Sequence, residues 1–406
     1  MNQAMSWPFI RLYLLALLYF SANAILNVMI PLQGKAWGAS STSIGLIMGA
    51  YMFTTMFFRP WAGRIIQKHG PVKVLRLILV INGIALILYT ITGFSGYLVA
   101  RILQGVSTAF FSMSLQIGII DALPEKERSQ GISFYSLFTY IPGILGPLLA
   151  LALWQSGGMN FFTITMIAIA IITGMFGYSV KVERTGDSQT LPAEQGAGLL
   201  KSYAQLVRNP FLFQCSLLML TASMVFGATT AFIPVYAFSL PQGNAGIYLA
   251  IQASVVVIAR YTLRKRIPSD AQWRSSLMMG MMLILAFAAG SISYSIHGGA
   301  VFFYAGAVLM GAAQAIIYPT LTTFLSFVLP QTDRNVLIGL FIATADLGVS
   351  LGGAVMGPVA DLTSYSWMYM FCALLAGVMT LAAYDRRKWF RAGKQAEELR
   401  HPEQIH

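Results

Sequence analysis

Charged residues are scarce in this chain, and their scarcity excludes most kinds of soluble protein. Only 10% of its 406 residues are Asp, Glu, Lys or Arg, whereas soluble domains average roughly 25%. Hydrophobic residues make up 57% of the chain, and its mean hydropathy is +0.68. Because a water-soluble surface needs far more charge, we expect most of the chain to lie in a lipid bilayer.

Cysteine and histidine are also rare, with two Cys and four His in the whole chain. Cys215 and Cys372 each lie within an apolar run, where we expect buried small side chains rather than a disulfide or a metal site. The histidines have no metal-ligand spacing, and there is no phosphate-binding glycine loop and no Ser/His pair in a polar context. The sequence therefore predicts no enzyme, no cofactor and no resident metal.

The apolar residues form runs that are each close to the ~20 residues needed to cross a bilayer as a helix. The first run lacks the small-residue cleavage pattern of a signal peptide, so we expect it to be retained as the first helix. The predicted fold is an all-α membrane protein with twelve transmembrane helices. Its spans lie near residues 9–31, 43–62, 74–94, 97–121, 131–154, 159–180, 210–238, 245–263, 274–296, 299–328, 335–360 and 366–385.

Basic residues outnumber acidic ones, with 26 Lys and Arg against 14 Asp and Glu, but they do not indicate a nucleic-acid partner. They lie in short polar segments between the apolar runs. Alternate connections collect them, for example Arg64, Lys68 and Arg76, whereas the other connections hold only Lys35. Because connections rich in Lys and Arg stay on the cytoplasmic side of a membrane, we expect both termini to be cytoplasmic.

A long internal repeat relates the two halves of the chain. Gly105 and Gly311 are 206 positions apart, and so are the Leu-Pro pairs that follow each of them at Pro124 and Pro330. An offset of about half the chain indicates a duplicated half. A duplicated bundle of membrane helices is typical of secondary transporters.

The widest polar gap, residues 181–209, is the expected cytoplasmic linker between these halves. It would join an N-terminal six-helix bundle over residues 1–180 to a pseudo-symmetric C-terminal six-helix bundle over residues 210–385. The polar residues 386–406 would form a cytoplasmic tail.

Asp346 is the one acidic residue about midway along an apolar run. A charge at bilayer depth costs several kcal/mol, at least about 2.5 on insertion scales, so its presence needs a reason. On a functional interpretation, the carboxyl binds and releases a proton as a cavity opens to each side in turn. On a structural interpretation, it is permanently hydrogen-bonded to a neighbouring helix or bends its own. The sequence leaves both open.

Arg101, Gln104 and Thr108 recur at helical spacing on the fourth predicted helix and share one face, with Gly105 beside them. On a functional interpretation, this face lines a water-filled cavity and the planar guanidinium of Arg101 binds a carboxylate. On the alternative, Arg101 extends to the outer membrane interface or pairs with a backbone carbonyl.

Further polar residues interrupt the apolar runs in both halves. Each is compatible with a hydrogen bond between packed helices or with a ligand contact. Together they give several helices a polar face, as a central cavity between two bundles requires. These additional candidate substrate-binding residues are Asn23, Asn27, Gln116, Tyr140, Gln252, Gln314 and Tyr318. Arg59 and Arg260 end the second and eighth runs, where the sequence favours a topological role at the cytoplasmic side.

The segment FRPWAGRIIQKHGPVKVL, between the second and third runs, resembles the cytoplasmic signature of the major facilitator superfamily, typically Gly-x-x-x-Asp-Arg-x-Gly-Arg. Gln67 stands here at the position of the Asp, and Pro71 at that of the second Arg. The resemblance implies a cytoplasmic gate whose charge cluster is altered, with Arg64, Lys73 or Arg128 as a replacement partner. The gate residues would be Gly63, Arg64, Lys68, Gly70 and Asp121.

Two further motifs strengthen this resemblance. Arg101-x-x-Gln104-Gly105 is similar to the helix-4 signature of the family, and Pro142-Gly143-x-x-Gly146-Pro147 is similar to part of a helix-5 signature of its antiporters. Longer stretches, such as VARILQGVSTAFFSMSLQIGIIDALPE and IATADLGVSLGGAVMGP, resemble bacterial exporters of opine metallophores. Those chelators, of the staphylopine type, carry several carboxylates and amines.

The resemblance covers nearly the whole chain except the linker and the tail. It implies a proton-driven exporter in the bacterial inner membrane, acting as a monomer on a small anionic chelator. We expect Asp346 to bind the proton and Arg101 to bind the anionic substrate. Three alternatives stay open: a multidrug efflux pump of the same fold, a non-transporting membrane sensor, and uptake by symport.

Overall fold

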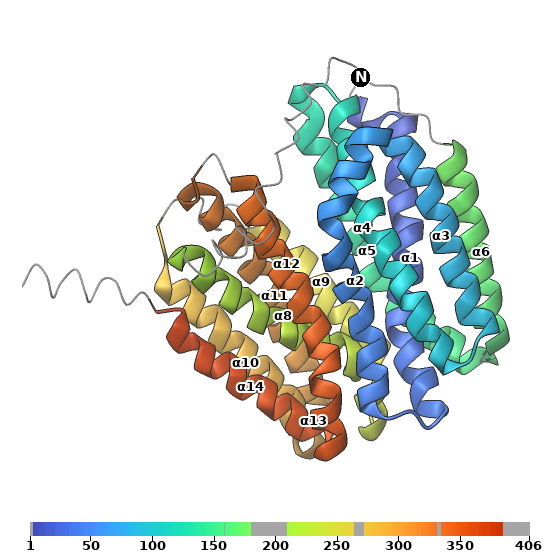
Figure 1. Cartoon of the computed structure of the whole chain (residues 1–406). Helices are drawn as coiled ribbons and strands as arrows, with labels where there is room; N and C mark the ends of the chain where they lie inside the picture. The colour runs from blue at the N-terminus through green and yellow to red at the C-terminus, as the bar shows by residue number, and fades with distance from the viewer. Residues whose placement is uncertain (1–2, 158, 180–208, 264–271, 331–333, 385–406) are drawn as a thin grey trace, which may run out of the picture.

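The computed structural model of the chain describes residues 3–157, 159–179, 209–263, 272–330 and 334–384, and the regular elements in these residues are helices. Twelve helical segments are long and apolar enough to cross a membrane, and each coincides with one predicted span. The elements, shown in Figure 1, are η1 (Gln3–Met5), α1 (Trp7–Ala36), α2 (Ser41–His69), α3 (Pro71–Ile91), α4 (Phe94–Ala122), α5 (Glu125–Gly157), α6 (Met159–Ser179), α8 (Pro210–Tyr236), η2 (Ala237–Ser239), α9 (Ala245–Leu263), α10 (Ser275–Gly298), α11 (Ala300–Val328), α12 (Arg334–Ala354), α13 (Met356–Leu362) and α14 (Tyr365–Ala382).

Local sequence explains where several helices begin and end. Gly70 ends α2 at φ +84°, a conformation that side chains with a Cβ rarely adopt, and Pro71 starts α3 with its φ already fixed. Ser40, Asn209 and Ser364 each accept a hydrogen bond from a backbone N–H in the first turn of α2, α8 and α14. Short polar or glycine segments therefore separate the long apolar helices.

The eleventh predicted span is present at Val336–Leu362, but its helix is interrupted at one residue, Val355. We expected one helix near residues 335–360, but α12 ends at Ala354 and α13 begins at Met356. Pro358 lies four residues after Ala354, so it cannot donate to that carbonyl and its ring would clash with it. Both α12 and α13 contact α2.

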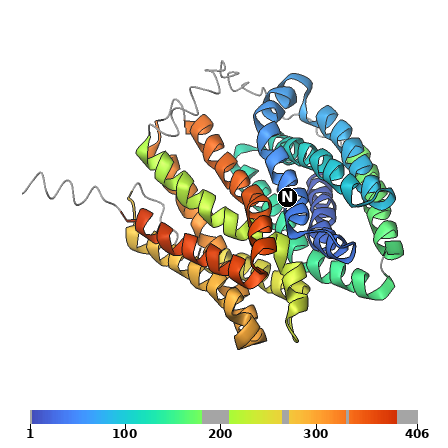
Figure 2. The ribbon, with the colours of Figure 1, turned by 60° about the horizontal axis from the view of Figure 1, so that its bottom comes forward.

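The helices form two groups, α1–α6 and α8–α14, which stay side by side in the views of Figures 1 and 2. In the first group α1 packs against α5, and both α2 and α3 pack against α4; in the second α12 packs against α8, and α10 against α11 and α14. Apart from Asn209, the predicted linker at 181–209 lies outside the described residues, as does the tail at 386–406. The proposed domain boundaries thus stay predictions.

The two groups meet along α2, which packs against α12 and α13, and along α5, which packs against α9. The α2–α12 approach is close because glycines face each other: a Cβ on Gly45 would lie 2.1 Å from the carbonyl oxygen of Gly353. At the start of α2, the carboxylate of Asp361 from α13 accepts hydrogen bonds from the backbone N–H of Ser41 and of Thr42, both at 2.8 Å. An acid from one group thus caps a helix of the other.

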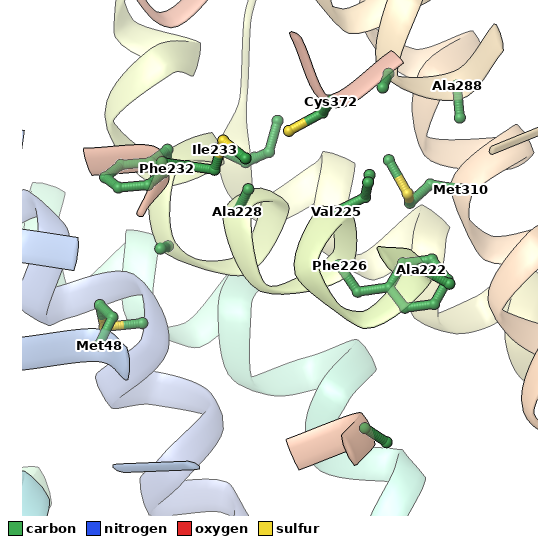
Figure 3. Packing of buried hydrophobic residues seen from close by; sticks show 14 of the residues in the cluster. Met48, Ala222, Val225, Phe226, Ala228, Phe232, Ile233, Ala288, Met310 and Cys372 are labelled. Carbon is green, nitrogen blue, oxygen red and sulfur yellow. The ribbon is translucent and has the colours of Figure 1, made fainter. Parts of the chain in front are cut away.

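The larger of two apolar clusters surrounds α8, which is buried around most of its circumference. Figure 3 shows Phe226 and Phe232 of α8 in this cluster, together with Met48 of α2 and Cys372 of α14. Cys215 and Cys372 are free thiols and are fully buried, as predicted. The buried helix α8 packs against α12, the helix that carries Asp346.

Candidate functional site

Arg101 is the largest side chain that the structure buries completely, at 0% exposure. Its Nη1 donates to the Oδ1 of Asn23 at 2.9 Å and to the Oε1 of Gln104 at 3.2 Å. Its Nη2 donates to the Oδ1 of Asn27 at 2.8 Å. The guanidinium carbon lies 5.1 Å from the ring centroid of Tyr51. Two adjacent turns of α1 therefore bind the arginine of α4 through their amide oxygens.

The positive charge of Arg101 is surrounded by neutral polar groups and an aromatic ring. Among the described residues no carboxylate lies within 4 Å of the guanidinium, and its Nε is buried without a hydrogen-bond partner. Amide oxygens and the face of an aromatic ring offset part of the cost of burying the cation. The predicted alternative of Arg101 extending to the membrane interface is wrong, because the side chain has no exposed surface.

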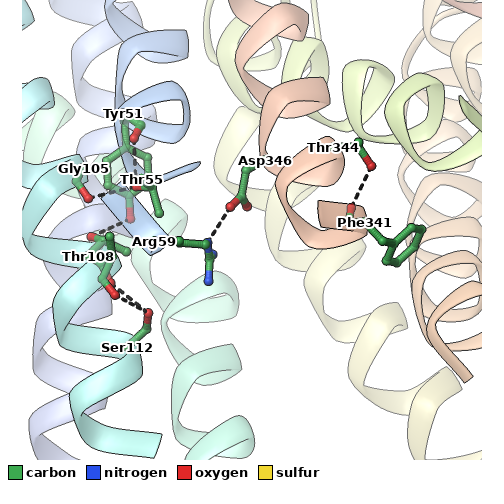
Figure 4. A network of polar contacts seen from close by, with 10 residues as sticks. Tyr51, Thr55, Arg59, Gly105, Thr108, Ser112, Phe341, Thr344 and Asp346 are labelled. Atoms are coloured by element: carbon green, nitrogen blue, oxygen red, sulfur yellow. Dashed lines mark hydrogen bonds and ion pairs between the residues drawn. The ribbon is translucent and has the colours of Figure 1, made fainter. Parts of the chain in front are cut away.

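Gln104 and Thr108 lie on the same face of α4 as Arg101, as their spacing predicted. Gln104 accepts a hydrogen bond from the hydroxyl of Tyr89 at 3.1 Å. The Thr108 hydroxyl lies 2.9 Å from the hydroxyl of Tyr19 and accepts from that of Tyr51 at 3.0 Å. Figure 4 shows Tyr51 between α2 and α4 in this polar network. The network links four helices of the first group, α1 to α4.

Asp346 forms an ion pair across the two groups. The Nε of Arg59, in α2, donates to the Oδ2 of Asp346, in α12, at 2.7 Å (Figure 4). The side chain of Asp346 is 10% exposed and that of Arg59 is 32% exposed. The sequence favoured a topological role for Arg59, whereas the structure gives it a specific acidic partner. A charge this deep in an apolar helix is therefore neutralised from the opposite group.

A second contact of the same kind joins α5 and α9. The Nη1 of Arg260 donates to the hydroxyl of Tyr140, and the guanidinium carbon lies 4.8 Å from the centroid of the same ring. Tyr140 and Asp346 are 206 positions apart, the offset that relates the two halves. The phenol and the acid therefore occupy positions related by the duplication, whereas their partners Arg260 and Arg59 are 201 positions apart.

The other predicted binding residues lie apart from Arg101. The Nε2 of Gln252 donates to the Oε1 of Gln314 at 3.0 Å, which links α9 to α11 within the second group. Tyr318 stacks on Phe341, with ring centroids 6.2 Å apart. Gln116 lies on an exposed part of α4. These contacts are compatible with helix packing and leave the ligand roles of these residues as predictions.

The predicted gate residues surround the connection between α2 and α3. Arg64 and Lys68 are exposed, and neither forms an ion pair within the described residues. Gly63 is half-buried in α2, and Gly70 provides the turn into α3. Asp121 lies in α4, but its side chain is outside what the structure describes. A gate formed by these residues stays a prediction.

Sequence reasoning missed Asp361, the acid that caps α2. Besides the two backbone N–H groups, it accepts from the hydroxyl of Thr42 at 2.6 Å, and the hydroxyl of Ser41 lies 2.8 Å from that of Tyr365. Acidic residues near helix ends are common, and only its place three positions after Pro358 distinguishes Asp361 in the sequence. Within the described part of the chain, no group of three His, Cys, Asp or Glu side chains is arranged to hold a metal ion.

Comparison with known proteins relates this chain to one family of membrane transporters. The model of the Major Facilitator Superfamily matches residues 12–296. The chain is 52% identical over 388 residues to the staphylopine export protein of Staphylococcus aureus, covering 95% of this chain and 98% of that protein. It is 20% identical over 386 residues to multidrug resistance protein 2 of Bacillus subtilis, covering 91% and 93%.

Solved structures with low identity share the fold. The nucleoside transporter NupG has a TM-score of 0.74 at 16% identity, covering 93% of this chain and 98% of that one. The human organic anion transporter MFSD10 (TETRAN) has a TM-score of 0.65 at 17% identity, with the same coverages. The predicted fold, with twelve helices in two pseudo-symmetric bundles, and the predicted resemblance are confirmed. The chain belongs to the major facilitator superfamily.

Proposed function

We propose that this membrane transporter exports an opine-type metallophore, a small chelator with several carboxylates and amines, by proton antiport with alternating access. The observation that carries the substrate class is Arg101, a buried cation that has no carboxylate partner among the described residues. A substrate rich in carboxylates complements such a positive site. The 52% identity to the staphylopine export protein along almost the whole chain supports the same conclusion.

Antiport requires that the proton and the substrate compete. In this proposal they compete for Asp346: a proton neutralises the carboxylate, or an ammonium group of the chelator pairs with it. When the substrate takes Asp346, a carboxylate of the same molecule pairs with Arg59, the present partner of that acid. Asp346 and Arg59 then each pair with an opposite charge of the zwitterionic substrate, so neither residue is left unpaired inside the membrane.

The ion pair also connects binding to the movement of the two groups. Arg59 and Asp346 belong to different groups, so a proton or substrate that separates them removes one attraction between α2 and α12. The groups then rock about the site, as in other transporters with duplicated halves. Inward proton movement supplies about 2.3 kcal/mol per charge per 100 mV of membrane potential.

A multidrug efflux pump is the second candidate, favoured by one observation. The relative in Bacillus subtilis named multidrug resistance protein 2 matches over 91% of this chain, although at only 20% identity. Lipophilic cations would use Asp346 without needing a buried arginine, so this candidate leaves the charge of Arg101 without a role.

The test is transport by the purified protein in proteoliposomes with an imposed proton gradient. We expect radiolabelled staphylopine to move against the proton flux in wild type and its gradient-driven transport to be lost in Asp346→Asn. The control is Glu127→Gln, an acid-to-amide change on a carboxylate that binds the backbone N–H of Ala4 outside the inter-group contact. Transport of a cationic dye without staphylopine transport would favour the multidrug candidate, and co-movement of proton and chelator would favour uptake by symport.

A further inference from the structure

We propose that Arg101 is a positioning residue, and that the amide nitrogens of Asn23 and Asn27 are the groups that bind substrate carboxylates. This inference rests on the proposed function, since it assigns roles within that binding site. It differs from direct carboxylate binding by Arg101, which was the functional interpretation drawn from the sequence.

The orientation of the two amides follows from the chemistry of arginine. A guanidinium has only N–H donors, so any group that hydrogen-bonds to it must present an acceptor. Asn23 and Asn27 therefore turn their oxygens toward Arg101, at 2.9 and 2.8 Å. The reverse orientation would set N–H groups against N–H groups beside a positive charge. Each Nδ2 is thus directed away from Arg101.

The positioning residue and the proposed binding residues differ in exposure to solvent. Arg101 is fully buried, whereas Asn23 and Asn27 are partly exposed. Within the described residues neither Nδ2 donates a hydrogen bond, and neither is among the polar atoms buried without a partner. Helix α1 also packs against α8, so it lies where the two groups meet. Two free donors therefore remain on a helix at the boundary between the groups.

The pair suits a carboxylate-bearing ligand in spacing and in charge. Residues four apart on a helix have Cβ atoms about 5–6 Å apart on one face, so two donors can bind two oxygens of one substrate. Hydrogen bonding of each amide oxygen to a cation polarises the amide and strengthens its N–H groups as donors. The same charge disfavours an amine at this position, which directs the ammonium groups of the substrate elsewhere.

Direct binding by Arg101 has a cost that this arrangement avoids. The guanidinium has no exposed surface, and the amide oxygens of Asn23 and Asn27 already bind both of its terminal nitrogens, so a carboxylate that bound Nη1 and Nη2 together would compete with these oxygens. An Asn displaced in this way would lose a charge-assisted hydrogen bond. Binding through the amide nitrogens keeps every present contact of Arg101.

The test uses isosteric substitutions in the full-length protein reconstituted in lipid nanodiscs. Asn23→Asp and Asn27→Asp keep an oxygen for Arg101 but replace each free donor by an acceptor. We expect each variant to unfold at the same or a higher temperature than wild type, because the carboxylate pairs with Arg101. We expect each to bind staphylopine roughly tenfold to a hundredfold more weakly, the loss of a hydrogen bond to a charged group. Weaker binding without lower stability is a result that a merely structural role would not give.

A double-mutant cycle then separates positioning from contact. If Arg101 acts through the amides, the double variant Arg101→Met, Asn23→Asp should bind staphylopine within about threefold of the weaker-binding single variant. If Arg101 touches the substrate, the two losses multiply, and the proposal is overturned. Unchanged binding in both Asp variants would overturn it as well.

The stability measurements test the contact between Arg101 and Asn23 without any ligand. Asn23→Asp should lower the unfolding temperature in the Arg101→Met background but not in wild type. If wild type binds no staphylopine, the proposed function fails, while this comparison still establishes or refutes the action of Arg101 on the amides. Equal effects of Asn23→Asp in the two backgrounds would refute it.

Discussion

Asp346 and Tyr140 occupy equivalent positions in the duplicated halves, yet they give the two inter-group contacts different chemistry. Arg59 binds a carboxylate that a proton can neutralise, whereas Arg260 binds a phenol that carries no charge to lose. A change in pH that weakens the first contact leaves the second in place. The duplicated transporter thus has one contact suited to proton coupling and one suited to holding the groups together.

The role of the Tyr140 contact predicts a small and specific loss of stability in Tyr140→Phe. The ring stays beneath Arg260, but the hydroxyl that accepts its hydrogen bond is removed. We expect the free energy of unfolding to fall by about 1 kcal/mol, the value of a partly exposed hydrogen bond, measured by denaturant unfolding in micelles.

The matched control is Tyr178→Phe. Arg76 lies over the ring of Tyr178 at 5.8 Å and donates to its backbone carbonyl rather than to its hydroxyl. Removing that hydroxyl should leave stability unchanged. An equal loss in both variants would mean that the Arg260 hydrogen bond contributes nothing of its own.

At the scale of helices, the start of α2 is capped twice, once by its own chain and once by the other group. Ser40 accepts from the backbone N–H of Ser43 at 3.1 Å, and Asp361 of α13 accepts from those of Ser41 and Thr42. Both caps satisfy N–H groups that a helix leaves free at its first turn. Only the second cap has to break when the two groups separate at this end.

Removing either cap should cost about 1 kcal/mol of stability, but only Asp361→Ala should change the distance between the groups. Spin labels at Trp37 and Leu362, both exposed, report that distance. Labelling through introduced cysteines is specific because the native cysteines are buried. We expect a longer and broader distance distribution in Asp361→Ala and an unchanged one in Ser40→Ala. Identical distributions in all three proteins would show that the cap does not hold this end together.

At the scale of the whole molecule, the contacts between the groups run along α2 from Ser41 to Arg59. These residues are 18 positions apart, which is about 27 Å along a helix. The contact therefore extends from one end of the helix groups to a point deep among the helices, where Asp346 lies. Which end faces the cytoplasm is predicted from the distribution of Lys and Arg.

The predicted orientation can be measured with a membrane-impermeant maleimide on single-cysteine variants. Trp37→Cys, in the connection between α1 and α2, should react in intact cells because that connection is predicted to be external. Lys68→Cys, in the last turn of α2 beside the connection to α3, should react only after the cells are opened. Both positions are exposed. The reverse pattern of labelling would place both termini outside.

The sequence by itself determined the twelve helices, their order and the family, because a bilayer requires long apolar helices and hydropathy is a local property. It also singled out Asp346 and the Arg101 face, since a polar residue in an apolar run is visible without any partner. The broken eleventh span was within reach of the same reasoning through Pro358.

Only the tertiary structure decided the partners. Arg59 and Asp346 are 287 positions apart, and Asp361 caps a residue 320 positions away. Periodicity shows which side of a helix is polar, but a partner depends on how two helices dock and rotate against each other, and that geometry is set by packing over both groups. For the same reason the sequence could place Arg101 on a polar face, whereas its complete burial and its contacts with α1 appeared only when α1 and α4 were packed together.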